Sequence, residues 1–326
     1  MNVLVTGAAG FVGLNIVRRL AERDARVVAL ARRPPDEAAL RFLGPLAERV
    51  TWANVDVRDR AALTQVAADA HIDSLIHAAT VTAPLSVEKA DPATILDINL
   101  GGTINALEAA RQAGVRRFVF ISSTGIYGSP DDPSQPIRED RPLAISSLYT
   151  IGKQAGEALC RRYAELFGLS AVSGRLGNAY GPMERATQSR TGMSVVYLLA
   201  HAALRGQPVR VHGAERTRDF CYSDDVADAF ARLALADTLH HDVYNVAGDF
   251  AAPVREVLDV LTDLLPGFRW QPADANAADV LTLPASARGT LDMSRLREDV
   301  GFTPRFGLAD GLRAYLDWLR QGWLDL

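Results

Sequence analysis

The sequence has too few cysteines for a disulfide framework. Among its 326 residues the cysteines are Cys160 and Cys221. Small secreted domains that depend on disulfides carry several pairs, so this scarcity indicates free thiols in a reducing compartment. The basic segment and cleavage site of a secretory signal are also missing, because Met1 leads straight into an apolar, β-branched run. We therefore expect a cytoplasmic protein.

Long hydrophobic runs and an excess of charge of one sign are absent as well. The longest mostly apolar stretch, residues 193–204, contains His201 and is too short to cross a bilayer. The net charge of −4 gives no electrostatic reason to expect nucleic acid or an anionic membrane as a partner. With 48% hydrophobic and 23% charged residues, the composition is typical of a globular protein with a sizeable core. The expected partner is a small-molecule substrate.

A glycine-rich turn follows the first expected strand. Residues 2–6 form a β-branched run, and residues 7–13, GAAGFVG, lead into an amphipathic stretch. In a strand–turn–helix unit such glycines permit a tight turn and a close approach of the backbone to a pyrophosphate at the helix N-terminus. The spacing is GxxGxxG, which differs from the usual GxGxxG. We expect a dinucleotide site that includes Gly7, Gly10, Phe11, Val12 and Gly13.

The end of the second expected strand bears on which dinucleotide binds. Residues 26–30 are followed by Ala31 and then by Arg32 and Arg33. An NAD-specific site usually has an acid here, which accepts a hydrogen bond from the ribose 2′-hydroxyl. A guanidinium would pair with a 2′-phosphate, so Arg32 slightly favours NADP within an NAD(P) site that leaves both cofactors open. Solvent-exposed loop charges are the alternative.

Further strand-like runs alternate with helix-like stretches. The runs at 50–55, 74–76 and 117–121 are separated by helical stretches, one of which spans roughly 93–113. This alternation predicts an α/β protein with a doubly wound parallel sheet, a Rossmann fold, whose ligands bind beyond the carboxyl ends of the strands. Residues 129–147 contain several prolines and acids and are expected to form an irregular loop over the site.

Tyr149 and Lys153 lie four residues apart and would share one face of a helix. An ammonium beside a phenol stabilises the phenolate and lowers a pKa that is ordinarily about 10. A hydroxyl from the segment 122–124, Ser-Ser-Thr, would hold a substrate oxygen while the tyrosine moves its proton. In isolation the same pair also fits a half-buried tyrosine next to a solvated lysine.

A series of short motifs extends over nearly the whole chain. They are GAAGFVG at 7–13, DVRD at 56–59, HAA at 77–79, INLGGT at 98–103, SSTGIYG at 122–128, YTIGK at 149–153, RLGNAYGP at 175–182, RDFCYSDDVADA at 218–229, YNVAG at 244–248 and DMSRLREDVGF at 292–302. In this order and at this spacing, the set resembles an extended short-chain dehydrogenase/reductase of the NAD-dependent epimerase/dehydratase family. Each motif alone is weak, and their order makes the resemblance specific.

The resemblance implies roles for the matched positions. Tyr149 would be the general acid/base, and Lys153 would lower its pKa and bind the nicotinamide ribose. Ser123, four residues before Tyr127, would hold the substrate oxygen. The other cofactor contacts would be Asp56 and Val57 at the adenine, Ala78, Ala79 and Thr80 along the phosphates and ribose, and Asn99, which would position the lysine or a water. A helix–helix hydrogen bond is the alternative for Asn99, and the expected site contains no metal.

The residues after Ser123 limit the types of reaction that the site could catalyse. Dehydratases of the family carry Asp-Glu there, whereas this chain has Thr124 and Gly125, which supply no carboxylic acid for elimination. The combined reductase–epimerase branch needs a cysteine in this region, and none is present. What remains is hydride transfer, either returned with inversion by an epimerase or released in a product by a dehydrogenase or reductase. A non-catalytic cofactor sensor is least expected, because it has no need of Ser123, Tyr149 and Lys153.

The second half of the chain bears on which class of substrate binds. By resemblance, Asn178 and Arg218 would contact a nucleotide diphosphate, and Thr124 is also expected at the substrate. Arg218 could instead pair with a neighbouring aspartate. The family's other phosphate-binding arginine falls here at Thr282, and Arg288 is out of register. A sugar-nucleotide epimerase is therefore the first expectation, and a dehydrogenase or reductase of a small sugar acid, polyol or hydroxy acid is the alternative.

The two parts of the molecule are expected to interleave. The dinucleotide-binding domain would span residues 1–177 with a return strand near 243–247, and a smaller substrate-binding portion would comprise 178–242 and 250–326. In the polar connector 183–192, Arg185 and Arg190 are either ligands for an anionic substrate or, more simply, solvated loop charges. The resemblance also implies a homodimer formed through the long helices near 93–113 and 148–167.

Overall fold

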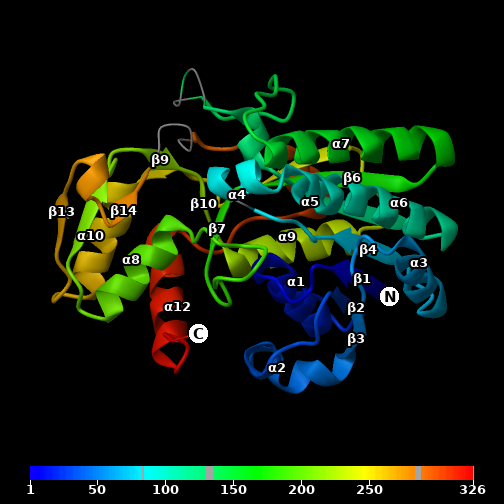
Figure 1. Cartoon of the computed structure of the whole chain (residues 1–326), viewed down its shortest axis with the longest axis horizontal. Coiled ribbons are helices and arrows are strands. Elements are labelled where there is room, and N and C mark those ends of the chain that lie inside the picture. Colours follow the sequence, from blue (N-terminus) through cyan, green and yellow to red (C-terminus); the bar gives the residue numbers. More distant parts are fainter. Residues whose placement is uncertain (83, 130–131, 133–134, 283–287, 326) are drawn as a thin grey trace.

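The computed structural model of the chain describes residues 1–82, 84–129, 132, 135–282 and 288–325. Its central sheet has seven parallel strands in the order β11-β6-β5-β4-β1-β2-β3 (Figure 1). They are β1 (Asn2–Thr6), β2 (Arg26–Ala31), β3 (Val50–Asn54), β4 (Ser74–His77), β5 (Arg117–Ser123), β6 (Ser170–Leu176) and β11 (Val243–Val246). The expected doubly wound α/β fold is confirmed.

Helices cover both faces of this sheet. One face packs against α1 (Phe11–Glu22), α2 (Glu37–Leu43), α9 (Ser223–Leu235) and α11 (Ser294–Val300), and the other against α3 (Arg60–Asp69), α6 (Gly102–Gln112) and α7 (Leu148–Phe167). Side chains alternate along a strand, so Val3 and Val5 join the first core and Leu4 joins the second. Burial on both faces explains why these strands read as continuous hydrophobic runs.

The helix expected near 93–113 is interrupted. It consists of α5 (Pro92–Leu96), a π-helical turn (Asp97–Gly101) and α6. Asn99 lies in the wider turn and is buried, and its carbonyl accepts a hydrogen bond of 2.8 Å from the Thr103 hydroxyl. Such single turns often occur at functional positions.

A second group of elements forms a smaller lobe with its own core. Helices α8 (Val195–Leu204), α10 (Val254–Leu264) and α12 (Leu308–Arg320) pack with a three-stranded sheet of β8 (Val209–His212), β13 (Trp270–Pro272) and β14 (Val280–Leu281), at the left of Figure 1. The connections to the large sheet contain two short strand pairs, β7 (Asn178–Tyr180) with β10 (Phe220–Tyr222) and β9 (Thr217–Arg218) with β12 (Ala252–Pro253).

The remaining elements are short. They are α4 (Leu85–Ala90) and the 3-10 helices Gly44–Arg49, Thr124–Tyr127 and Ala275–Ala277. The described residues between 129 and 147 are irregular, and Ile137 among them pairs with Leu291. Over the described part of the chain, no helix combines the length and apolarity needed to cross a membrane.

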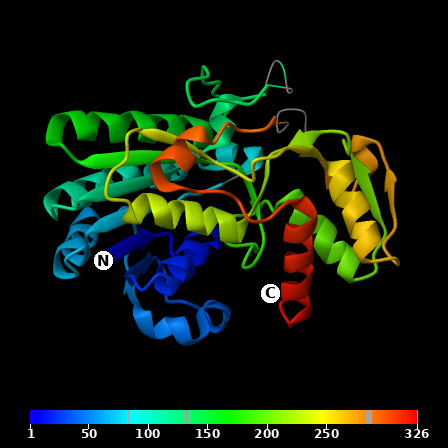
Figure 2. The same ribbon diagram turned by 180° about the vertical axis from the view of Figure 1, so that it is seen from behind.

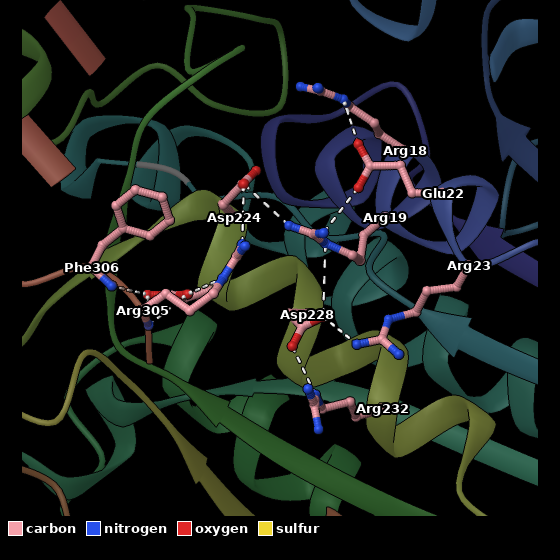
Figure 3. Close-up of polar contacts among 10 residues, drawn as sticks. Arg18, Arg19, Glu22, Arg23, Asp224, Asp228, Arg232, Arg305 and Phe306 are labelled. Carbon is pink, nitrogen blue, oxygen red and sulfur yellow. Dashed lines mark hydrogen bonds and ion pairs between the residues drawn. The ribbon is translucent and has the colours of Figure 1, made fainter. Parts of the chain in front are cut away.

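A network of ion pairs joins α1 to α9, which run side by side (Figures 2 and 3). Asp228 on α9 accepts hydrogen bonds of 2.6 Å from Arg23 and 2.7 Å from Arg232. The Arg19 guanidinium lies 3.8 Å from the same carboxylate. The single carboxylate of Asp228, 8% exposed, is therefore shared by three arginines, two of which lie at the end of α1 away from the glycine turn.

The same network extends to the segment that precedes α12 (Figure 3). Asp224 forms ion pairs with Arg19 at 3.1 Å and with Arg305 at 3.3 Å. The buried Asp225 accepts the backbone N–H groups of Arg305 and Phe306, each at a distance of 3.0 Å. These contacts tie the smaller lobe to the helix that begins at the glycine turn.

Asp228→Ala should lower the free energy of unfolding by about 2 kcal/mol, because three guanidiniums lose their shared carboxylate. Asp310, whose exposed carboxylate pairs with Arg313 on α12, provides the control. Its replacement by alanine should change stability by less than about 0.5 kcal/mol. Urea unfolding at neutral pH measures both values, and equal losses in the two variants would contradict the importance of the network.

Candidate active site

The turn between β1 and α1 requires glycine at two positions. Gly7 has a φ of 65°, and a Cβ placed there would lie 2.7 Å from the backbone nitrogen of Ala79. A Cβ at Gly13 would overlap the carbonyl oxygen of Gly7. Gly10 is exposed at the start of α1 and donates its N–H to that same carbonyl at 2.9 Å. The turn thus presents bare backbone and a helix N-terminus to a ligand.

A groove of about 490 Å³ opens in front of this turn. With the exception of Asn99, Tyr149 and Lys153, all the expected cofactor-binding residues line it. They are Gly7, Gly10, Phe11, Val12, Gly13, Arg32, Asp56, Val57, Ala78, Ala79 and Thr80. Residues from the ends of four neighbouring parallel strands therefore converge on one groove, and a flat elongated ligand fits its size and backbone surface.

Asn99 lies behind the groove and stabilises one of its walls. Its side-chain oxygen accepts hydrogen bonds from the Thr80 hydroxyl at 3.1 Å and the Val81 N–H at 2.7 Å. Its amide nitrogen donates to the Val81 carbonyl at 3.0 Å. In this structure Asn99 holds the loop after β4, and its side chain makes neither the lysine contact nor the helix–helix hydrogen bond that the sequence suggested.

Arginines gather at the outer end of the groove. Arg32 and Arg33 donate to the same side-chain oxygen of Gln188, at 2.9 and 3.1 Å. Arg185 forms an ion pair of 2.7 Å with Asp36. The connector 183–192 thus crosses the groove by side-chain contacts to the end of β2, and Arg185 is not the solvated charge that was the simpler expectation.

Asp56, at the end of β3, is held by Arg58. The carboxylate accepts hydrogen bonds from the Arg58 backbone N–H at 3.0 Å and from its guanidinium at 2.8 Å. The hydrogen bond from the Arg58 side chain keeps the pKa of Asp56 below its ordinary value. Asp56 is therefore an ionised acceptor facing the groove.

A second cavity of about 350 Å³ adjoins the groove and contains the expected catalytic set. Ser123, Tyr149 and Lys153 line it together. Residues that line both spaces mark the junction, and they are Phe11, Val12, Ala78, Thr80, Thr82 and Arg190. A ligand in the groove and one in this cavity would therefore meet at this junction, and Tyr149 lies on the cavity side of it.

The two serines at the end of β5 have different environments, because successive strand residues face opposite sides. The Ser122 hydroxyl is buried and donates to Glu157 at 2.6 Å. The Ser123 side chain is half-buried and accepts the Gly125 N–H at 3.1 Å. Both serines line the cavity, but the Ser122 hydroxyl is engaged by Glu157, so Ser123 is the hydroxyl that remains for a ligand.

Lys153 is 3% exposed, and its Nζ donates to the Ile121 carbonyl at 2.7 Å. The ammonium also lies 5.5 Å from the centre of the Tyr149 ring. Burial lowers the pKa of Lys153 to about 7, and the negative charge of Glu157 acts against this decrease. Lysine therefore changes charge near neutral pH at this position.

Burial also raises the pKa of Tyr149, and the Ser123 side chain and the Arg190 charge oppose this increase. The lowering of that pKa expected from Lys153 is not the net effect in this structure. Desolvation of the half-buried phenol outweighs the favourable charges around it.

Asp219 organises the residues expected at the substrate. It is fully buried and accepts hydrogen bonds from the Asn178 side chain and, at 3.3 Å, from the Thr124 hydroxyl. Arg218 donates to the Asn178 side-chain oxygen at 3.4 Å. Asn178 and Arg218 line the cavity, whereas Thr124 is turned towards Asp219 and is not among the lining residues. From the sequence, a neighbouring aspartate, Asp219 or Asp224, was only an alternative partner of Arg218, and the position of Asp219 next to Arg218 in the RDF motif was the signal available.

The sequence assigned no firm role to two further arginines near the cavity. Arg288 is 8% exposed, its N–H bonds the Thr217 carbonyl at 3.0 Å, and its charge acts on both Arg218 and Asp219. Arg190 lies with its guanidinium 5.3 Å from the centre of the Phe11 ring and forms an ion pair with the buried Glu184. Both are built into the structure, so Arg190 is not a solvated loop charge.

No group of three or more metal-ligating side chains occurs among the residues that the structure describes. The polar groups of the cavity are instead hydroxyls, a phenol, an amide and cations. The fold and this site define an enzyme of the extended short-chain dehydrogenase/reductase type, with a glycine-lined groove that opens beside a serine–tyrosine–lysine set. The chain belongs to the NAD-dependent epimerase/dehydratase family, whose model matches residues 3–247.

Relatives extend this assignment over the full length. The UDP-glucose 4-epimerase of Mycolicibacterium smegmatis is 32% identical, over 98% of this chain and 99% of that protein. A dTDP-4-dehydro-6-deoxy-D-allose reductase from a Streptomyces species is also 32% identical, over 98% and 96% of the two chains. The crystal structure of Thermus thermophilus UDP-glucose 4-epimerase with NAD is 31% identical with a TM-score of 0.81, over 98% and 99%. The family resemblance is confirmed, and the protein is a nicotinamide-dependent epimerase or oxidoreductase.

The buried Asp219 gives stability a defined pH dependence. Burial raises its pKa to about 6, against the effects of Arg288, Asn178 and Thr124, whereas an unfolded aspartate titrates at about 3.9. The folded state binds this proton more tightly than the unfolded state does. Protonation of Asp219 therefore contributes fully to the free energy of unfolding below about pH 4, and this contribution is lost as the pH rises through about 6. The unfolding free energy of the wild type, minus that of Asp219→Asn, should fall by about 2 kcal/mol between pH 4 and 7. Urea unfolding across this range tests it, and a difference that rises with pH would contradict it.

Proposed function

We propose that the protein is an NAD(P)-dependent epimerase of a sugar nucleotide, with Tyr149 as the acid/base. The observation that supports this most directly is the shared cavity. Ser123, Tyr149 and Lys153 line it together with Asn178 and Arg218, and it adjoins the glycine-lined groove. The groups that would transfer a proton and a cation that could bind phosphate thus lie within reach of one ligand.

The residues of the chain divide the acid/base work. Ser123 holds the substrate oxygen by a hydrogen bond, and Tyr149 accepts the proton of the alcohol and later returns it. The charge of Lys153, close to the Tyr149 ring, stabilises the phenolate that accepts this proton. The cofactor supplies the acceptance and donation of hydride. Gly7, Gly10 and Gly13 fit such a group, because their bare backbone leaves room for a pyrophosphate at the start of α1.

Arg218 and Asn178 would bind the diphosphate of the substrate. The Arg218 guanidinium faces the cavity, and burial keeps its pKa below the ordinary value while Asp219 opposes this shift. Even with this lowering an arginine stays cationic at neutral pH. The names of the epimerase relatives, which act on UDP-glucose, support a sugar nucleotide as the substrate.

An alternative is a dehydrogenase or reductase that releases its reduced or oxidised product. Thr282 favours this, because it stands where the resemblance expects a second phosphate-binding arginine and it is fully buried. The Streptomyces reductase is as similar in sequence as the Mycolicibacterium epimerase. Elimination of water is disfavoured, because Thr124 faces Asp219 and no acid follows Ser123.

We also propose the molecular organisation that the sequence suggested. Residues 1–177 with the strand near 243–247 would bind the dinucleotide, and 178–242 with 250–326 would bind the substrate. A cytoplasmic homodimer would form through α7 and the interrupted helix beside it. Exposed apolar side chains on α7, which are Ile151, Leu166 and Phe167, support this surface.

Tyr149→Phe should leave cofactor affinity nearly unchanged and reduce turnover by at least about 100-fold, because the proton acceptor is lost. Tyr163→Phe on the same helix, which removes a hydroxyl bound to Glu108 away from the cavity, should keep its turnover. The assay follows candidate sugar nucleotides with excess cofactor. An epimerase changes the configuration of the substrate without accumulating reduced cofactor. Accumulation of reduced cofactor identifies the alternative, a dehydrogenase. A modest effect of Tyr149→Phe on either reaction would contradict the role of this tyrosine.

We propose that Arg32 gives NADP a small advantage over NAD, since it lines the groove where an acid would bind the ribose. Arg32→Asp should shift the ratio of the two dissociation constants towards NAD by about tenfold, because a charge-assisted contact is lost and a repulsion gained. Arg26→Asp, at the exposed opposite end of β2, should leave the ratio unchanged. Calorimetric titration measures both, and tighter binding of NAD by the wild type would contradict the proposal.

A further inference from the structure

A third residue continues the face of α7 that carries Tyr149 and Lys153. Glu157 lies one turn beyond Lys153, so the three side chains recur at a spacing of four along one side of the helix. The Glu157 side chain is completely buried. It does not line the substrate cavity or the groove. A buried carboxylate next to a buried ammonium therefore lies beneath the reacting groups.

Glu157 is held rigidly by the sheet. The Arg175 guanidinium on β6 donates to both of its oxygens, from Nε at 2.9 Å and from Nη2 at 2.7 Å. The Ser122 hydroxyl on β5 adds a hydrogen bond of 2.6 Å. Bidentate pairing of this kind fixes direction as well as distance, so the carboxylate is held in place.

Arg175 is anchored in turn by neutral oxygens. Its Nη1 donates to the Tyr127 hydroxyl and to the Glu139 carbonyl, both at 2.8 Å. The guanidinium is 3% exposed. The positive charge of Arg175 is therefore compensated chiefly by Glu157, and the buried ion pair cannot move towards solvent.

The surroundings of Lys153 contain few other charges. From β5 it meets the Ile121 carbonyl and, at 5.0 Å from the ring centre, Phe120. From β4 it faces His77, whose burial lowers its pKa to about 3 and keeps it neutral. On α7 itself the neighbours are Tyr149 and Glu157. Of these groups, Glu157 is the anion that acts on the ammonium.

We propose that Glu157 is a positioning residue that keeps Lys153 cationic in its buried site, and that Arg175 fixes Glu157 for this task. The proposal deepens the proposed function, since it rests on the charge of Lys153 being needed beside Tyr149. It predicts that the alkaline limit of catalysis depends on a carboxylate that touches neither substrate nor cofactor.

The scarcity of lysine allows a direct test. The chain contains two lysines, Lys153 and the exposed Lys89 on α4, so carbon-13-labelled lysine gives two signals in an NMR titration of the whole protein. In the wild type the Lys153 signal should titrate well below the ordinary range of a lysine, because burial lowers the pKa of this side chain. Glu157→Gln should lower the Lys153 midpoint by about one pH unit, because one nearby opposite charge has been removed. Glu157→Asp keeps the charge and should recover most of this shift.

Two further variants separate charge from packing. Glu108→Gln removes a carboxylate on α6 that binds Arg111 and Tyr163, and it should leave the Lys153 midpoint unchanged. If Glu157→Gln alone fails to fold, because it leaves Arg175 buried without its partner, the double variant Glu157→Gln/Arg175→Met replaces it. Its Lys153 midpoint should still lie below that of the wild type. An unchanged midpoint in whichever Glu157→Gln variant folds would overturn the proposal.

Activity provides a second readout. With a turnover assay in hand, the alkaline limb of the pH profile in Glu157→Gln should move to lower pH by the same amount as the NMR midpoint, since turnover falls as Lys153 loses its proton. A shift of the NMR midpoint with no shift of the limb would show that the charge of Lys153 is not needed, which overturns the proposed function and leaves the electrostatic coupling intact. An unchanged NMR midpoint overturns the coupling alone.

Discussion

The burial of one positive charge constrains the whole active site. An ammonium in an apolar interior is costly unless hydrogen bonds and an opposite charge compensate for the lost water. Lys153 obtains these from the Ile121 carbonyl, the faces of two aromatic rings and the carboxylate of Glu157. The compensation requires α7 to pack along β5 and β6, which supply the Ile121 carbonyl and the Arg175 guanidinium that holds Glu157. Tyr149, one turn away on the same helix, is then placed beside Ser123, with whose side chain it forms a hydrogen bond.

The second constraint is the connection between the two lobes. The cavity is lined by residues of the large sheet and of the smaller lobe, so their relative position determines whether Arg218 and Tyr149 can face one ligand. Asp219 helps to fix this relative position, since its carboxylate accepts hydrogen bonds from Asn178 and Thr124, which lie in separate segments. The ion pairs of α1 and α9 secure the same junction from behind (Figure 3). Buried acids, rather than apolar packing alone, thus set the geometry between the lobes.

Local patterns in the sequence were sufficient for the fold and the family. The glycine turn, the strand–helix alternation and the ordered motifs predicted the doubly wound sheet, and the family assignment is confirmed. They were insufficient where a side chain is oriented by a distant partner. Thr124 turns towards Asp219, and Arg185 pairs with Asp36. The π-helical turn at Asn99 has the same origin, because its amide is fitted to a loop of another strand. Such long-range pairings leave no periodic signal in the sequence.

The opposite orientations of Ser122 and Ser123 have a consequence for how the chain tolerates insertions and deletions. Ser122 pairs in register with Arg175 and Ser123 with Leu176 across β5 and β6. Loss or gain of one residue within β5 would exchange the two faces, presenting the wrong hydroxyl to the cavity and withdrawing the other from Glu157. Changes of length in the loops before β5 carry no such penalty. The strand is thus intolerant of single-residue length changes for a reason that its composition does not reveal.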